Sequence, residues 1–230
     1  MARGFLRAIL HGLPEVTAKA AVSLDGAIAT AAGESQWITG EPARAHGHEL
    51  RARHDAILVG IGTVLEDNPR LTCRARSALE GSDPVPVVLD SDLRIPKDAA
   101  LFSSSKRAVV FCRKGAPERD LPCEVVRIDD DERGVDLRAV LQALVTRDLH
   151  RVLVEGGGAI HRSFMDARLL DTLHLYLAGL VIPGGKPWVA GAPVERLQDA
   201  LRLGRPRTTA LGDDILLSYD LSAQHVCGEA

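Results

Sequence analysis

Short apolar runs that suit β-strands alternate with helical patterns along the 230-residue chain, and this alternation restricts the fold more than any other feature. The runs are rich in β-branched residues and are bounded by turn signals. They cover Val16–Val22, Ala56–Val59, Val85–Leu89, Ala108–Phe111, Glu124–Ile128, Val152–Val154, Leu173–Leu177 and Ile215–Tyr219. Helical patterns fall between some of them, at Glu41–Arg53, Val135–Asp148 and Ala159–Ala167.

Strand–helix–strand units of this kind favour a mostly parallel sheet with helices on both faces. The runs from Leu173 onward lack long helices between them, which predicts antiparallel edge strands there. The most polar stretches, Arg76–Pro84, Arg113–Pro122 and Asp129–Arg133, are short enough to be loops. We therefore expect one α/β domain over residues 1–230, built on a single open sheet.

Charge and hydropathy exclude several classes of function. The formal net charge of −3 provides no basic field for nucleic acid or for an anionic membrane. No apolar run reaches the roughly 20 residues that span a bilayer. The apolar part of Met1–Leu10 is short and interrupted by Arg7, with no clean cleavage site after it, so we do not expect a signal peptide.

Cysteine usage predicts a reducing environment. The four cysteines, Cys73, Cys112, Cys123 and Cys227, lie far apart, and none belongs to a pair at metal-ligand spacing. Free thiols in the cytoplasm and no metal site are the plain expectation.

Three glycines, Gly156–Gly158, follow the strand pattern Val152–Val154 and precede a helical pattern. Glycines at this position let backbone N–H groups approach a phosphate at a helix N-terminus. The alternative is a tight turn that needs positive φ angles. Three consecutive glycines at the carboxyl end of a parallel strand favour the phosphate, although neither the Rossmann nor the P-loop motif is present.

Two charged residues are hard to explain as parts of a core. Glu155 ends a buried strand pattern, so it should face a cleft or pair with a neighbouring Arg or Lys. Lys19 lies inside an otherwise apolar run. The Asp25-Gly26 pair that follows is first of all a turn signal.

Other polar positions are open to two interpretations. Trp37 lies in a polar segment, where it could stack on a flat ring or pack under a loop. Asp90 and Ser91 close a strand pattern, where they could cap a turn or contact a nucleotide. The arginines near the strand pattern at residues 56–59 could form bidentate contacts with phosphate, although single surface arginines are usually only solvated; they are Arg51, Arg70 and Arg74.

Taken in order, these segments closely resemble the reductase domain of the bacterial riboflavin-biosynthesis deaminase/reductase enzymes over roughly residues 15–185. The resemblance is carried by Lys19-x-Ala21-x-Ser23-Leu24-Asp25-Gly26, Gly33-Glu34-Ser35-Gln36-Trp37-Ile38-Thr39, Arg51, the stretch from Asp55 through Gly62-Thr63 and Asp67-Asn68-Pro69 to Leu71-Thr72-x-Arg74, Leu89-Asp90-Ser91-x-Leu93-Arg94 and Leu153-Val154-Glu155-Gly156-Gly157-Gly158.

The resemblance implies a dihydrofolate-reductase-like fold and reduction of a phosphorylated ribosylaminopyrimidine by NADPH, with hydride transfer to the ribosyl C1′. It implies catalytic roles for Lys19 and Glu155, and substrate contacts by Ser35, Arg51, Leu71, Arg74 and Glu155. Cofactor contacts are implied for Ala21, Trp37, Thr63, Asp67, Ser91, Gly157, Gly158, Ala159, Ile160, His161, Arg162 and Ser163. It also implies a homodimer.

Two departures from the bifunctional enzymes shape the expectation. The chain lacks the His-x-Glu and Pro-Cys-x-x-Cys motifs of a zinc deaminase, which indicates a stand-alone reductase. The segment Ala178–Gly191 is more similar to the Pro-Val-Ile-x-Gly-Gly segment of the archaeal reductases, which act before deamination. The substrate is therefore either the deaminated or the diamino pyrimidine.

Two other classes of function compete with this one. A dihydrofolate reductase needs a buried carboxylate on the first long helix, where Glu41 and Glu49 are the only acids, and Arg51 instead favours a phosphorylated substrate. A non-catalytic nucleotide-binding regulator would be expected to lose Lys19, Glu155 or the arginines. The sequence also leaves open the alternative that the chain is a reductase of a secondary-metabolite pathway rather than of the vitamin pathway.

Overall fold

The computed structural model describes residues 2–75, 83–131 and 134–222. The chain divides into two compact units, and each is built from two chain segments. The first unit comprises Met1–Val16 and Ala45–Gly156, and the second comprises Thr17–Arg44 and Gly157–Ala230. Because each unit is made of two separate chain segments, neither corresponds to one continuous stretch of sequence joined to the other by a linker. The expectation of one domain over residues 1–230 stays a prediction.

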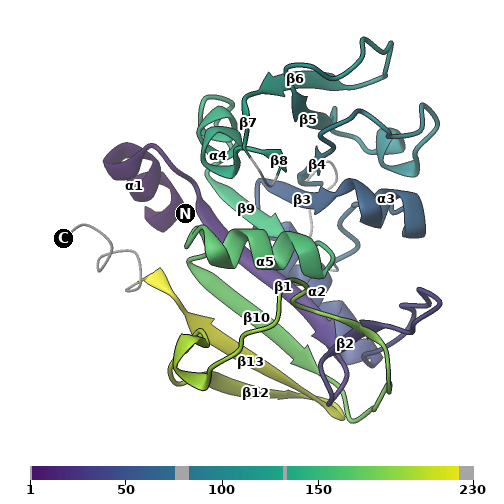
Figure 1. Ribbon diagram of the computed structural model, residues 1–230, viewed down its shortest axis with the longest axis vertical. Helices are drawn as coiled ribbons and strands as arrows, with labels where there is room; N and C mark the ends of the chain where they lie inside the picture. The colour runs from purple at the N-terminus through teal and green to yellow at the C-terminus, as the bar shows by residue number, and fades with distance from the viewer. Residues whose placement is uncertain (1, 76–82, 132–133, 223–230) are drawn as a thin grey trace. The chain divides into compact units, whose positions relative to one another are not determined.

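The sheet of the first unit is entirely parallel, with strand order β9-β3-β4-β5-β6 (Figure 1). Its strands are β3 (Ala56–Gly60), β4 (Val85–Leu89), β5 (Val109–Arg113), β6 (Glu124–Ile128) and β9 (Arg151–Val154). Every residue of β3 is buried. A strand covered on both faces reads as a continuous apolar run, which is why Ala56–Val59 shows no alternation.

The helices of the first unit are α1 (Ala2–His11), α3 (Ile61–Asp67) and α4 (Leu137–Val145), with a 3-10 turn at Ala100–Ser103. The helix α2 (Glu41–Ala52) begins in the second unit and ends in the first. Asp136 starts α4, because its carboxylate accepts hydrogen bonds from the backbone N–H groups of Arg138 and Ala139. The apolar side of α4 is wholly buried at Leu141 and Leu144.

The sheet of the second unit has strand order β12-β13-β10-β1. Its strands are β1 (Glu15–Val22), β10 (Thr172–Leu177), β12 (Arg207–Leu211) and β13 (Asp214–Asp220). β10 runs parallel to β1 and antiparallel to β13, and β12 is antiparallel to β13. The unit also holds α5 (Gly158–Asp166), a 3-10 turn at Leu197–Asp199, and a two-stranded pairing of β2 (Ala27–Ala29) with β11 (Lys186–Pro187).

These elements confirm the predicted class, a mixed α/β fold with mostly parallel strands, flanking helices and antiparallel C-terminal strands. The predicted turn at Asp25-Gly26 is also confirmed, since Gly26 has a φ of 83° and donates its N–H to the carbonyl of Ser23. One expectation is wrong: the stretch predicted as a loop at Asp129–Arg133 contributes β7 (Asp130–Asp131), which pairs with β8 (Gly134–Val135).

Parts of two predicted loops lie outside the described residues, namely residues 76–82 of the first and 132–133 of the second, as does Cys227. Among the described cysteines, Cys73, Cys112 and Cys123 are free thiols, as predicted. Burial raises the pKa of the Cys123 thiol to about 11. No helix within the described ranges is long and apolar enough to cross a membrane.

His54, which follows α2, gives the fold a pH dependence. Its Nδ1 lies 2.7 Å from the carbonyl oxygen of Leu50, so Nδ1 carries the proton that is donated. Burial, reinforced by the charge of Arg151, lowers the pKa of His54 in the folded chain despite the opposing effects of Leu50 and Asp55. As the pH falls below the unfolded value of about 6.5, the unfolded chain binds the proton first.

We therefore expect the free energy of unfolding to decrease as the pH falls from about 6.5 toward the lower folded-state pKa of His54. Urea denaturation at a series of pH values between 7.5 and 5 measures this slope. In His54→Gln the dependence of the unfolding free energy on pH should become shallower. Part of it should remain, because burial also lowers the pKa of the His46 imidazole. An unchanged slope in the variant would contradict the assignment to His54.

Candidate functional site

Glu155 continues from the end of β9, and its carboxylate is held by Arg51 from the last turn of α2. Its backbone N–H donates to the carbonyl of Leu58 at 2.9 Å, which extends the pairing of β9 with β3 by one residue. Arg51 Nε lies 3.0 Å from Oε1 and an Arg51 terminal nitrogen lies 2.8 Å from Oε2 of the carboxylate. The side chains are only 19% and 12% exposed. The interpretation of Glu155 as a partner of a neighbouring arginine is confirmed.

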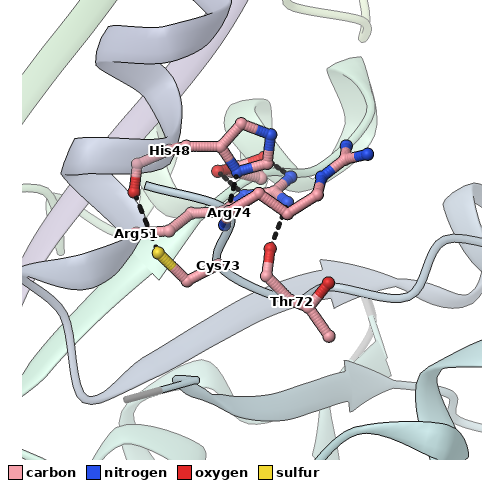
Figure 2. A network of polar contacts seen from close by, with 6 residues as sticks. His48, Arg51, Thr72, Cys73 and Arg74 are labelled. Atoms are coloured by element: carbon pink, nitrogen blue, oxygen red, sulfur yellow. Dashed lines mark hydrogen bonds and ion pairs between the residues drawn. The ribbon is translucent and has the colours of Figure 1, made fainter. Parts of the chain in front are cut away.

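Arg51 also reaches the segment that follows α3. Its second terminal nitrogen donates to the carbonyl oxygen of Thr72 at 3.0 Å (Figure 2). Burial alone would lower the pKa of the guanidinium, but the charge and hydrogen bonds of Glu155 outweigh burial and raise it. Arg51 is therefore a permanent cation that links the end of β9 to the segment at Thr72.

Residues 71–75 form a loop whose backbone is fastened to α2. The N–H of Arg74 donates to Nδ1 of His48 at 3.3 Å, and the thiol of Cys73 lies 3.3 Å from the carbonyl oxygen of His48 (Figure 2). The N–H of Cys73 donates to the carboxylate of Asp83 at 2.8 Å. The loop is thus fixed from two sides, while the side chain of Arg74 itself is exposed.

Leu71 opens this loop in a left-handed conformation, with φ of 54°, and the residue is only 3% exposed. The expected substrate contact by Leu71 therefore has no exposed apolar side chain behind it. Three of the predicted substrate residues of the first unit, Arg51, Arg74 and Glu155, belong to one network of hydrogen bonds with His48 and Thr72.

The glycine turn lies at the start of α5, where the first backbone N–H groups of a helix have no partner within the helix. None of Gly156–Gly158 has a positive φ, so the alternative of a tight turn that needs left-handed glycines is wrong. A Cβ atom at Gly158 would lie 2.4 Å from the carbonyl oxygen of Pro187, whereas a Cβ at Gly157 would meet nothing within 4 Å. Gly158 is needed for close packing, and Gly157 borders open space.

The remaining predicted cofactor residues of α5 differ in exposure. His161 is fully buried with its ring near Trp188, and Arg162 pairs with Asp166 at 2.8 Å. Ser163 donates its hydroxyl to the carbonyl of Ala159. These side chains are occupied within the helix or its packing, so the first turn of α5 offers a ligand chiefly backbone N–H groups such as that of Ala159. The N–H of Ile160 already donates to the carbonyl of Gly157 at 3.0 Å.

Lys19 is half-buried on β1, and its ammonium nitrogen lies 5.3 Å from the centre of the Tyr176 ring on β10. Ala21, two residues further on the same face of β1, is paired in register with Tyr176. The cation–π contact places the ammonium group beside the aromatic ring.

Trp37 is 64% exposed, so the alternative that it packs beneath a loop is wrong. The guanidinium carbon of Arg44 lies 4.7 Å from the centre of its ring, and Arg44 is anchored by a hydrogen bond of 2.6 Å to the carbonyl of Thr39. The exposed ring remains suited to stacking on a flat group. Ser35, in the same segment, is partly exposed.

In the first unit, Thr63 and Asp67 lie one turn apart on α3, with Asp67 exposed. Ser91 follows β4 beside the fully buried Asp90, whose carboxylate accepts a hydrogen bond of 2.8 Å from the N–H of Ile95. Asp90 therefore closes a turn, as one of the two interpretations predicted. Ser91 presents its hydroxyl close to Gly134.

Sequence reasoning did not select His48 or Asp83, which fix the loop at residues 72–74. His48 and Arg51 lie three residues apart on α2, and this spacing places both on one helix face. Asp83 leaves no such signal. The described residues include no group of three or more His, Cys, Asp or Glu side chains that could hold a metal ion.

The fold defines an α/β protein of the dihydrofolate-reductase-like class. The dihydrofolate reductase of Enterococcus faecalis has the same fold, with a TM-score of 0.51, 12% identity and coverage of 90% of this chain and 95% of that one. Residues 14–217 match the family described as the RibD C-terminal domain. The chain belongs to this family.

Two relatives illustrate the range of the family. The riboflavin biosynthesis protein RibD of Bacillus amyloliquefaciens is 37% identical over 223 residues, which are 93% of this chain and 59% of that protein. The 2,5-diamino-6-ribosylamino-4(3H)-pyrimidinone 5′-phosphate reductase of Methanothermobacter thermautotrophicus is 36% identical over 211 residues, which are 90% of this chain and 97% of that protein. Among solved structures, Acinetobacter baumannii RibD has a TM-score of 0.83 and 30% identity, covering 95% of this chain and 61% of that one.

The chain therefore spans about 59% of the length of the Bacillus relative and nearly the full length of the archaeal one. The resemblance found in the sequence alone is confirmed at the level of the family.

Proposed function

We propose that this chain reduces the ribosyl side chain of a phosphoribosylaminopyrimidine to a ribityl side chain, with NADPH as reductant, in riboflavin biosynthesis. The observation that carries the proposal is the arrangement at the end of β9. There a carboxylate fixed bidentately by Arg51 is followed directly by a glycine turn and a helix N-terminus bordering open space. Membership of the RibD C-terminal domain family supports the same function.

The residues suit a nicotinamide dinucleotide. The N–H groups at the start of α5 supply donors for a pyrophosphate, and the open space at Gly157 leaves room for its close approach. Trp37 offers an exposed aromatic face, and Thr63, Asp67 and Ser91 offer polar groups toward the nucleoside parts. When bound, NADPH supplies the hydride, and the protein supplies orientation and electrostatics.

On the substrate side, Arg74 is the proposed phosphate contact, together with the main chain of Leu71 and the hydroxyl of Ser35. Glu155 would accept a hydrogen bond from a ribose hydroxyl or a ring N–H. Because Arg51 fixes both carboxylate oxygens, that acceptor has one defined position.

The reaction adds a hydride to C1′ of the ring-opened imine and a proton to the imine nitrogen. Lys19 is the proposed source of polarisation at this centre, either directly or through a water that it holds. Its ammonium group lies beside the Tyr176 ring, and from there it would donate a hydrogen bond to the nitrogen as the proton arrives.

The substrate before deamination is a second candidate. The Methanothermobacter reductase is named for the 2,5-diamino compound, and the alignment with this chain covers 97% of that protein. The segment Ala178–Gly191 resembles the archaeal pattern as well. The diaminopyrimidinone 5′-phosphate is therefore included in the test below.

NADPH oxidation, followed by its absorbance with each pyrimidine phosphate in turn, tests both candidates. We expect rapid oxidation with at least one of the two, a lower rate with NADH, and negligible oxidation with dihydrofolate. Oxidation with neither pyrimidine would refute the proposed function and leave the fold unaffected. Faster oxidation of NADPH with dihydrofolate than with either pyrimidine would indicate that the chain is a dihydrofolate reductase instead.

We further propose a homodimer located in the cytoplasm, as the family resemblance implies. Sedimentation equilibrium at micromolar concentration should give twice the mass of the 24.7 kDa chain. A mass equal to that of one chain at all concentrations would contradict the dimer.

A further inference from the structure

The exposed indole of Trp37 is covered on one face by a guanidinium from the first turn of α2. The guanidinium carbon of Arg44 lies 4.7 Å from the centre of the ring, and a terminal nitrogen of Arg44 donates to the carbonyl oxygen of Thr39 at 2.6 Å. Trp37 nevertheless remains 64% exposed. Much of the indole surface outside the face under Arg44 is therefore open to a ligand.

The contact with Arg44 restricts the orientation of the ring. An exposed side chain on a loop samples several rotamers, and ordering it on binding costs conformational entropy. The planar guanidinium can stack on the indole with its face while its N–H groups donate at its edge, so Arg44 makes both contacts at once. The indole is thus held near one orientation before a ligand arrives.

The carbonyl that Arg44 holds is itself fixed. Thr39 is only 7% exposed, and the N–H of the next residue, Gly40, donates to the carboxylate of Asp214 at 2.7 Å. Asp214 is buried at the start of β13, so the hairpin of β12 and β13 fastens the end of the segment that carries Trp37. Arg44 therefore links a fixed backbone position to an exposed ring.

We propose that Arg44 is a positioning residue for the cofactor, which holds the indole of Trp37 in the orientation that stacks on a flat ring of the nicotinamide dinucleotide. This inference rests on the proposed function, in which Trp37 contacts NADPH. The alternative is that the positive charge of Arg44 attracts the phosphates of NADPH directly. The two mechanisms differ in one respect: only the first requires the Trp37 ring.

A double-variant cycle on NADPH affinity separates the two mechanisms, with binding followed by the fluorescence of NADPH itself. Trp37→Leu should lower the affinity about tenfold, as loss of one aromatic stacking contact does. Arg44→Met should lower it about three- to fivefold. In the Trp37→Leu background, the same Arg44→Met change should lower it by less than about 1.5-fold. An equal loss from Arg44→Met in both backgrounds would overturn the inference.

The fluorescence of Trp37 gives a readout that does not depend on the cofactor. The chain has two tryptophans, so a Trp188→Phe background leaves Trp37 as the only indole emitter. In this background Arg44→Met should make the emission more easily quenched by acrylamide, because the covered face of the ring becomes accessible. Unaltered quenching in folded Arg44→Met would overturn the inference.

Arg196→Met is the matched control for the quenching and the affinity. Arg196 is an exposed arginine that pairs with Asp199 at 2.7 Å, so its loss should leave both quantities unaltered. Arg44→Lys tests the geometry and serves if Arg44→Met fails to fold. An ammonium group can cover the ring or donate to Thr39, but not both at once, so lysine should retain only part of the affinity. Full affinity in Arg44→Lys would show that charge alone suffices and would overturn the inference.

The two levels of the proposal fail in different ways. Absence of NADPH binding to the unaltered protein overturns the proposed cofactor and this inference with it. Binding to the unaltered protein, with the same loss from Arg44→Met whether or not Trp37 is present, overturns this inference alone.

Discussion

Lys19→Met is expected to lower kcat about a hundredfold or more at saturating substrate, the range that a positioned acid–base group contributes. Methionine keeps the apolar stem within β1 but removes the ammonium group beside Tyr176. The hydride donor and the other substrate contacts stay in place, so we expect KM for the pyrimidine to change much less than kcat. Steady-state NADPH oxidation at several pyrimidine concentrations measures both parameters.

Lys97→Met provides the matched control. Lys97 is an exposed lysine of the first unit that pairs with the exposed Asp120 at 2.6 Å, so its loss should leave kcat unaltered. Thermal unfolding of Lys19→Met measures its stability separately, so that loss of the cation–π contact, about 0.5–1 kcal/mol, is not mistaken for loss of kcat. A kcat within threefold of the unaltered value in folded Lys19→Met would remove Lys19 from the reaction.

Gly158→Ala is expected mainly to lower the stability of the fold, whereas Gly157→Ala is expected mainly to weaken NADPH binding. At Gly158 the added Cβ would lie 2.4 Å from the Pro187 carbonyl oxygen and 2.9 Å from the backbone nitrogen of Ala190, so the backbone must shift. Overpacking of this kind costs about 1–3 kcal/mol of unfolding free energy. At Gly157 the Cβ meets no protein atom within 4 Å, and the unfolding free energy should fall by only about 0.5–1 kcal/mol, because alanine is less favourable than glycine at the N-cap of α5.

Gly157→Ala should instead weaken NADPH binding, by about tenfold or more, because its methyl group would occupy the space that the proposed pyrophosphate needs. Thermal unfolding separates the stability effects of the two variants, and fluorescence titration with NADPH measures the affinity. Each variant serves as the control for the other. Unaltered NADPH affinity in Gly157→Ala would place the pyrophosphate elsewhere.

Much of the fold could be predicted because apolar periodicity survives wherever a strand or helix is buried. All eight predicted strand patterns coincide with strands to within two residues at either end. β12 escaped prediction because four of its five residues are exposed, so Arg207-Thr208-Thr209 shows no apolar alternation. The short pairings of β2 with β11 and of β7 with β8 depend on tertiary contacts that a local pattern does not record.

The sequence could name candidate site residues, which stay predictions, but it could not give the interactions among them. The spacing of the glycines and Glu155 indicated that the end of β9 was unusual, and the ordered motifs identified the family. The sequence could not show which of two arginines holds Glu155, because Arg51 and Glu155 are 104 positions apart. Asp83 was missed for another reason: it is only ten positions from Cys73, but no local pattern marks its carboxylate as the partner of the Cys73 N–H.

The pairing of β1 with β10 has a consequence for synthesis on the ribosome. Thr17 pairs with Thr172, so β1 emerges about 150 residues before its partner strand. At about 5–20 residues per second, the apolar strand waits roughly 8–30 s before it can pair with β10. The first unit, by contrast, has β3, β4, β5 and β6 following one another along the chain as direct neighbours. We therefore expect nascent chains that stall before residue 151, ahead of both β9 and β10, to hold a folded parallel sheet and an unpaired β1, which makes them targets for chaperones.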